Sequence, residues 1–235
     1  MESGEKNRKN RAKPVKNEAE TNADTKTALI LAAGELFGKQ GFDGVSTRMI
    51  AEKAGVNLGA IHYHFGSKEN LYVESLRAIA AEGKRLYLSE ILKTRGELLD
   101  TPQGKSEIVR ELVFRFFQDL FGSSRVEWKK RLIIQELFSP SPMMPALVET
   151  IMKSDSHELA EFYRDIRPES SQDEAYAWAD LLYAQGFFYL MGKEPLGLLR
   201  GERYMGTEFF HTVAITTARS MILLAGLPLP EGLAL

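Results

Sequence analysis

Apolar residues recur every three or four positions through most of the chain, which is the spacing expected for one face of a helix. In the first such stretch the apolar positions are Leu29, Ile30, Ala33, Leu36 and Phe37. Asp24 precedes them as a possible helix cap, and Gly41 follows them as a stop. The pattern therefore predicts a first helix over residues 24–40.

Two short helical segments and a long one come next. Ser46 precedes "TRMIAEKA", Asn57 precedes "LGAIHYHF", and Ser67 precedes a long apolar pattern that continues to about Lys93. Ser and Asn are favoured as N-terminal caps because their side chains accept hydrogen bonds from the first free amides of a helix. We expect a second, a third and a long fourth helix here.

Helical spacing returns after a polar connection that ends near residue 106. It predicts helices over residues 107–121, 126–138, 143–165, 173–192 and 204–225. The segment "SPSPMMP" separates the second of these from the third, because proline lacks an amide donor. No alternating runs typical of strands are present, so the predicted fold class is all-α.

The second and third helices are joined by "AGVN", and three positions around it have a geometric meaning. Ala51 is small where two helices cross, Gly55 lies where the turn needs a positive φ, and Ile61 is apolar where the third helix packs back. This spacing is typical of a DNA-binding helix-turn-helix.

The third helix is expected to have two different faces. Its predicted inner face carries Leu58, Ile61 and Phe65. Its predicted outer face carries Gly59, Ala60, Tyr63 and His64, with His62 near the border. Small residues allow a helix to approach base edges, and Tyr and His can donate hydrogen bonds to phosphates, so the outer face suits DNA.

Composition and charge limit the classes of function. The 235 residues include no cysteine, which excludes disulfides and cysteine-ligated metals. No apolar stretch approaches the ~18 residues of a membrane span, and no signal-peptide core is present, so we expect a cytoplasmic protein without a membrane partner. The net charge is −2, yet residues 1–16 hold six basic groups and two acidic ones. Residues 1–23 are predicted to be a disordered basic arm, which either contacts nucleic acid or is a solvated tail.

Residues 27–72, "TALILAAGELFGKQGFDGVSTRMIAEKAGVNLGAIHYHFGSKENLY", resemble the N-terminal domain of TetR-family transcriptional regulators. The most specific part of the resemblance is the pattern formed by Tyr63, His64, Phe65, Lys68 and Leu71. The later stretch "QELFSPSPMMPALVE" is similar, at a lower level, to the C-terminal domain of the CecR-like branch of that family.

The resemblance implies a role for each matching position. Residues that match phosphate-binding positions are Thr47, Tyr63, His64 and Lys68. Arg48 matches a position that can read a guanine, which suits the two-pronged geometry of its guanidinium. Variable base-facing positions are matched by Gly59, Ala60 and His62.

The histidines allow two other interpretations. A metal site formed by His62 and His64 is disfavoured, because side chains two positions apart on a helix point about 200° apart and no third ligand stands nearby. The other alternative is that Tyr63 and His64 are exposed aromatic residues that cap the packing of the fourth helix.

The last two helices each carry a regular stripe that could form a four-helix dimer interface. The stripes are Trp178, Leu182, Gln185 and Tyr189, and Phe209, Val213, Thr216 and Ser220. The alternative is that both stripes face the core of their own subunit.

A small-molecule pocket is expected among the aromatic and sulfur-containing side chains of residues 107–165. The candidate ligand residues are Phe117, Trp128, Arg131, Gln135 and Met144. The alternative is that these side chains form an ordinary core.

The resemblance implies three regions: the arm at residues 1–23, a DNA-binding domain at 24–72, and a helical ligand-binding and dimerisation domain at 73–228. It also implies a homodimeric repressor that binds a palindromic operator in double-stranded DNA and releases it when an effector binds, with the long fourth helix carrying the signal. A DNA-binding regulator controlled by a protein partner, without a pocket, is the alternative. An enzyme is not expected, since no nucleotide-binding, hydrolase or metalloprotease motif is present, and no cofactor is predicted.

Overall fold

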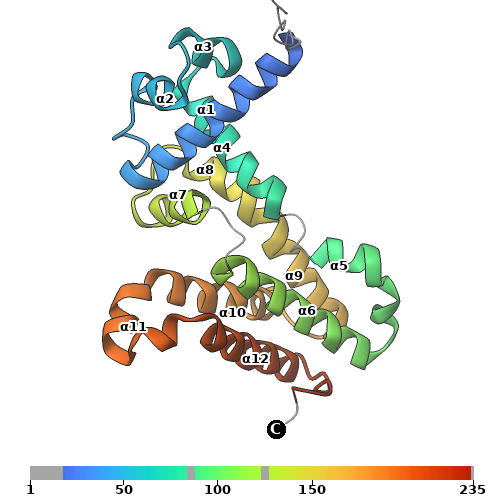
Figure 1. Cartoon of the computed structure of the whole chain (residues 1–235). Helices are drawn as coiled ribbons and strands as arrows, with labels where there is room; N and C mark the ends of the chain where they lie inside the picture. Colours follow the sequence, from blue (N-terminus) through green and yellow to red (C-terminus); the bar gives the residue numbers. More distant parts are fainter. Residues whose placement is uncertain (1–17, 84–87, 123–126, 234–235) are drawn as a thin grey trace, which may run out of the picture.

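A computed structural model of the chain describes residues 18–83, 88–122 and 127–233. Within these ranges every regular element is a helix, which confirms the predicted all-α class (Figure 1). None of the helices in the described ranges is long and apolar enough to span a membrane.

The N-terminal domain forms the upper part of Figure 1. Its helices are α1 (Glu18–Gln40), α2 (Thr47–Ala54), α3 (Gly59–Phe65) and α4 (Lys68–Gly83). The prediction placed the start of the first helix at Asp24, but α1 begins at Glu18. The added residues, "EAETNA", include Glu and Ala, which favour helix without needing to bury an apolar face.

The remaining elements form the lower body and its connection to the N-terminal domain. They are α5 (Leu88–Arg95), η2 (Gly96–Asp100), α6 (Pro102–Phe121), α7 (Glu127–Phe138), α8 (Met144–Leu147), η3 (Val148–Met152), α9 (Lys153–Ile166), α10 (Gln172–Met191), α11 (Lys193–Arg200), η4 (Glu202–Met205) and α12 (Thr207–Leu224). Here η2 and η4 are 3₁₀ helices, and η3 is a π-helical turn.

One further boundary differs from the sequence-based expectation for a local reason, and the predicted fourth helix is described only in part. The helix predicted from residue 107 begins at Pro102, because the Thr101 hydroxyl accepts a hydrogen bond from the Gly104 amide (3.0 Å) and proline is favoured in the first helical turn. The fourth helix was predicted to continue to Lys93. The structure describes two segments of this region, α4, which ends at Gly83, and α5, which begins at Leu88. Residues 84–87, through which the predicted helix would run, lie outside the described ranges.

The buried apolar side chains form two clusters, which we call the upper core and the lower core. The upper core contains α1–α4 together with Trp128 and Leu132 from α7 and Leu147 from α8. The lower core is built from α5, α6, α9, α10 and α12. Although α7 and α8 follow α6 in the sequence, their buried side chains therefore complete the core of the N-terminal domain.

Helices α1 and α7 approach each other closely. A Cβ atom added at Gly34 would lie 2.3 Å from the Trp128 ring, and one at Gly38 would lie 3.1 Å from the Trp128 carbonyl oxygen. These distances are shorter than ordinary van der Waals contact, so the missing side chains are what allow the contact between the two helices.

A buried polar group also joins α4 to α7. The Tyr72 hydroxyl donates to Glu136 Oε2 (2.5 Å), and the amide and hydroxyl of Ser141 donate to Glu136 Oε1 (3.0 and 2.9 Å). Burial, followed by the hydrogen bond to Glu136, raises the pKa of the Tyr72 hydroxyl above its usual range. The carboxylate is thus buried with three donors.

A single run of helix connects the two cores. Elements α8, η3 and α9 are continuous from Met144 to Ile166. Leu147 belongs to the upper core, whereas Leu159 and Phe162 belong to the lower core. The π-helical turn η3 lies between these two buried segments.

Candidate nucleic-acid interface and cavity

The turn between α2 and α3 has the geometry that the sequence predicts. The Ser46 hydroxyl accepts a hydrogen bond from the Met49 amide (3.2 Å) and begins α2. Gly55 ends that helix with φ of 67°, and the Val56 amide donates to the Ala51 carbonyl (3.0 Å). A residue with a side chain would be strained at this φ, so the glycine allows the sharp turn into α3.

Helix α3 begins where Asn57 Oδ1 accepts a hydrogen bond from the Gly59 amide (2.7 Å). Ile61 and Phe65 are buried in the upper core, as predicted. Leu58 is not: its side chain is 51% exposed, so its placement on the inner face was wrong. Leu58 has helical backbone angles (φ −56°, ψ −35°), so the helical period is kept, and it is the packing at the start of α3 that leaves this side chain uncovered.

Seven of the predicted DNA contacts lie on α2 and α3. Arg48, Gly59, His62 and Tyr63 are exposed, and Thr47, Ala60 and His64 are half-buried. Figure 1 shows the two helices next to each other at the upper end of the molecule.

The aromatic residues of α3 have defined surroundings. The rings of Tyr63 and His64 meet edge to face with centroids 5.1 Å apart. His62 Nδ1 lies 2.8 Å from the Gly66 carbonyl oxygen, to which it donates when that nitrogen carries the proton. The same hydrogen bond holds the ring of His62, whose orientation the sequence left undecided.

Lys68, the eighth predicted DNA contact, is directed toward the protein. Its ammonium donates to the carbonyl oxygens of Phe42 and Val45 (3.0 Å each) and lies 4.0 Å from the centroid of the Phe42 ring. In this structure the side chain therefore ties the start of α4 to the connection between α1 and α2.

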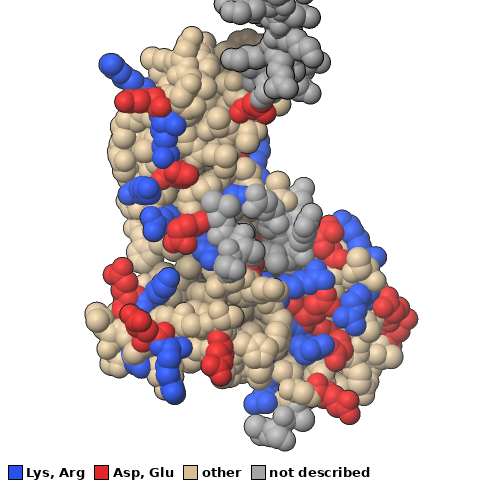
Figure 2. All heavy atoms as spheres, viewed as in Figure 1, with Lys and Arg blue, Asp and Glu red and all other residues tan. Residues whose placement is uncertain are grey.

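The surface of the N-terminal domain is not strongly basic. Helix α3 contains no Lys or Arg, and on the face shown in Figure 2 the charged side chains of both signs are interspersed. Lys53 on α2 pairs with Glu35 (2.8 Å). The basic groups of residues 1–16 lie outside the described ranges.

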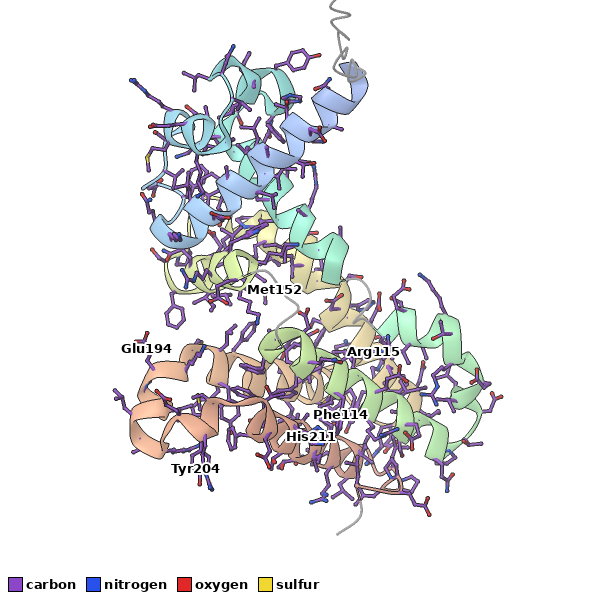
Figure 3. All side chains as sticks on the ribbon, in the orientation of Figure 1. Phe114, Arg115, Met152, Glu194, Tyr204 and His211 are labelled. Atoms are coloured by element: carbon purple, nitrogen blue, oxygen red, sulfur yellow. The ribbon has the colours of Figure 1, made fainter. Side chains whose placement is uncertain are left out.

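A cavity of about 380 Å³ lies where the body meets the N-terminal domain. It is lined by residues of α4–α7, α8, η3, α9 and α10, which are Ile79, Leu88, Leu112, Phe116, Asp119, Leu120, Ile133, Leu147, Ile151, Met152, Asp155, Ser156, Leu159, Asp180, Leu182, Tyr183, Ala184 and Phe187. Figure 3 labels one of them, Met152, at the level where the two parts join.

None of the five predicted ligand residues lines this cavity. Phe117 is buried in the lower core and Trp128 in the upper core. Arg131 is exposed and pairs with Glu127 (3.4 Å), Gln135 lies against Gly41, and Met144 packs on the upper core.

The sequence carried a partial signal for the residues that do line the cavity. On α6, Leu112, Phe116 and Leu120 recur every four positions, which places them on one helical face. The faces contributed by α9 and α10 become neighbours of this one only through tertiary packing.

The two predicted dimer stripes are divided between the core and the surface. Trp178 and Leu182 are buried in the lower core, and Trp178 Nε1 donates to the Met221 carbonyl oxygen (2.9 Å). The other six stripe residues line a groove between α10 and α12, namely Gln185, Tyr189, Phe209, Val213, Thr216 and Ser220. Val213 is also buried in the lower core, so the alternative interpretation holds for Trp178, Leu182 and Val213.

Residues 29–74 match the family model described as "Bacterial regulatory proteins, tetR family". The helix-turn-helix segment of this chain is therefore similar to that of the TetR family. In particular, the sequence is 38% identical over 94 residues to the HTH-type transcriptional dual regulator CecR of Shigella flexneri, covering 38% of this chain and 40% of CecR. It is 30% identical over 84 residues to the HTH-type transcriptional repressor AcnR of Corynebacterium glutamicum, covering 36% of this chain and 42% of AcnR. The chain thus spans less than half the length of these relatives, and no enzyme stands among them.

Solved structures share the fold over most of the chain. NalD, the secondary repressor of the MexAB-OprM efflux pump in Pseudomonas aeruginosa, superposes with a TM-score of 0.58 at 20% identity and covers 86% of this chain and 96% of its own. The multidrug-binding protein EbrR, in complex with malachite green, gives a TM-score of 0.57 at 20% identity over 87% and 98%. The helix-turn-helix domain and the helical body therefore share the fold of these two proteins.

Proposed function

We propose that the chain is a transcriptional repressor that binds an inverted-repeat operator as a homodimer and releases it when a small molecule occupies the cavity. The observation that carries the DNA-binding part is the division of α3 into two faces. Ile61 and Phe65 anchor it in the upper core, while Gly59, His62 and Tyr63 are left exposed. In a helix-turn-helix this is the helix that enters the major groove.

The predicted contacts divide into phosphate-binding and base-reading groups. Thr47, Tyr63 and His64 are assigned to phosphates, and Arg48 is assigned to a guanine. The base-facing positions are Gly59, Ala60 and His62. Since the ammonium of Lys68 already bonds two carbonyls, we assign it to holding α4 in place beside the phosphate contacts.

Leu58 is added to this set because of its exposure. An apolar side chain at the start of the recognition helix suits the methyl group of a thymine, which only the major groove presents. With two small residues following it, Leu58 and Arg48 would supply most of the direct base contacts.

The test is selection of binding sites from a random DNA library, together with footprinting of the DNA upstream of the chain's own gene. We expect an inverted repeat whose half-sites are about 34–36 Å apart, or a multiple of that distance. Arg48→Ala is expected to weaken operator binding by about 1–3 kcal/mol and to relax the preference at one base pair. Equal loss of affinity for operator and random DNA would remove Arg48 as a base reader.

The groove between α10 and α12 is the proposed dimer surface. Phe188, Leu223 and Leu224 on these two helices are more than half exposed, which is unusual for large apolar side chains on a free surface. We expect the double substitution Thr216→Asp/Ser220→Asp to give a monomer by sedimentation and to lower operator affinity, whereas Ser154→Asp on exposed α9 should do neither. A double variant that remains dimeric would contradict this assignment.

The cavity supports control by a small molecule over control by a protein partner, because a partner-controlled regulator needs no internal space. Its wall includes Ile79 near the end of α4 and Ile151 and Met152 of the π-helical turn. A ligand there would contact both elements that lead to the DNA-binding domain.

Reciprocal coupling provides the test of this control. A ligand that lowers operator affinity about a hundredfold must itself bind about a hundredfold more weakly in the presence of operator. Compounds found by thermal shift are titrated with and without operator DNA. Ligands that bind equally well in both titrations would exclude the proposed coupling, and an absence of ligands would favour the protein partner.

A further inference from the structure

The wall of the cavity has an uneven distribution of charge. Asp119 on α6, Asp155 on α9 and Asp180 on α10 line it, and no Lys, Arg or His stands among the described residues that do so. The three carboxylates come from three different helices, so they surround the space rather than follow one exposed helical face. All the other lining side chains are apolar or uncharged.

Aromatic rings accompany these carboxylates. Phe116, Tyr183 and Phe187 line the same cavity, and the rings of Phe116 and Tyr183 meet edge to face with centroids 5.8 Å apart. The face of an aromatic ring is negative and attracts cations, and the attraction grows when water is excluded. Carboxylates and ring faces therefore favour the same sign of charge.

We propose that the cavity binds a lipophilic organic cation, with Asp155 and Asp180 as its carboxylate contacts. This inference rests on the proposed function, since it names the class of effector for the same cavity. A volume of about 380 Å³ lies at the lower end of the range for ligand sites, so the cation is a compact multi-ring compound.

The two carboxylates occupy different depths. Asp155 is half-buried in the first turn of α9, directly after the π-helical turn, whereas Asp180 is exposed and belongs to the rim. Asp119 and Asp155 each make contacts of their own within the protein. The proposal is compatible with these contacts, because one ionised carboxylate has two oxygens and accepts several donors. An anionic ligand would instead place like charge beside these carboxylates.

The experiment compares three probes of similar shape and different charge, which are methyltriphenylphosphonium, triphenylphosphine oxide and tetraphenylborate. Calorimetric titration of the full chain should give an affinity for the phosphonium at least about tenfold higher than for the neutral oxide, and weaker binding still for the borate. Asp180→Asn and Asp155→Asn should each lower phosphonium affinity several-fold and leave oxide affinity within about twofold.

Asp165→Asn is the matched control, since Asp165 is exposed at the far end of α9 and does not line the cavity. It should change neither affinity. If Asp155→Asn lowers the melting temperature, the exposed Asp180→Asn still tests the electrostatic preference.

The outcomes separate this inference from the function on which it rests. Binding of the oxide and the phosphonium with equal affinity, abolished by the cavity-filling Ser156→Phe, would keep the small-molecule site and overturn its preference for cations. Tighter binding of the borate than of the phosphonium would also overturn the preference for cations. Failure of all three probes to bind would count against both proposals.

Discussion

The upper core and the lower body differ in how completely their apolar side chains are packed. In the upper core, Gly34 lets the Trp128 ring contact α1, and the buried Glu136 carboxylate has three donors from Tyr72 and Ser141. The body below contains the cavity and the groove between α10 and α12, and it leaves Phe188, Leu223 and Leu224 exposed.

This difference indicates which part of the molecule has space for a ligand and surface for a second copy of the chain. The core of the N-terminal domain is filled by side chains of α1–α4 together with Trp128, Leu132 and Leu147, which holds α3 in a fixed position. The body has an unfilled cavity and exposed apolar side chains. In the proposed function, a ligand would fill the cavity and a second copy of the chain would cover the apolar surface. The helical run α8–η3–α9 connects the two, and its π-helical turn borders the cavity. Such turns are frequent at functional sites.

The largest expected effect follows from emptying the upper core. Trp128→Ala removes a side chain that is only 5% exposed, and it should lower the free energy of unfolding by about 3–5 kcal/mol. Phe138→Ala, at an exposed position of the same helix, should change it by less than about 0.5 kcal/mol. Urea unfolding measures both. Equal and small losses would show that the upper core is no more tightly packed than the surface of α7.

A second test concerns the buried polar group of the upper core. Tyr72→Phe removes one of the donors to Glu136 and should cost about 1–3 kcal/mol, because a buried carboxylate then lacks part of its hydrogen bonding. Tyr63→Phe is the control, since Tyr63 is 76% exposed and its substitution should leave unfolding unchanged. If both variants unfold at the same urea concentration, the Tyr72 hydroxyl does not stabilise the contact between α4 and α7.

The third prediction applies to the body, where a substitution is expected to raise the free energy of unfolding rather than lower it. Ser156→Phe should fill part of the cavity and raise the free energy of unfolding by about 0.5–2 kcal/mol, while it abolishes ligand binding and preserves operator binding. Ser154→Phe, on the exposed side of the same helix, should leave ligand binding intact. A destabilised Ser156→Phe that still binds ligand would falsify the description of this volume as an effector site.

The smallest effect is a pH dependence at the beginning of α10. The Ser171 amide and then the Ser171 hydroxyl, which form a capping box with Glu174, hold the pKa of that carboxyl below its usual 4.5. The stabilisation is therefore present above pH 4.5 and is lost as the pH falls through the lower, folded-state pKa.

Wild type should accordingly be more stable than Glu174→Gln at pH 7, and the difference should shrink at pH 3, as measured by thermal unfolding. Glu208→Gln serves for comparison, because α12 begins at Thr207 after Gly206, which provides no side-chain cap. A difference that does not depend on pH would show that the charge of Glu174 adds nothing to the cap.

The sequence alone was sufficient for the all-α class and for the helix-turn-helix. Ser46, Gly55, Ile61 and Phe65 act within a few residues of their own position, through a cap, a positive φ and the period of a helix. Such local effects can be predicted from the order of residues. Leu58 also follows the helical period, but it is exposed, because burial depends on whether another element covers that position.

Tertiary structure decided which helical faces meet. Trp128 and Phe116 come from neighbouring aromatic-rich stretches, yet Trp128 completes the upper core and Phe116 lines the cavity. Lys68 was expected at a phosphate, but it bonds carbonyls more than twenty positions earlier in the chain. Burial and these contacts depend on how residues far apart in the sequence pack in three dimensions, whereas caps, turns and helical periods depend only on near neighbours.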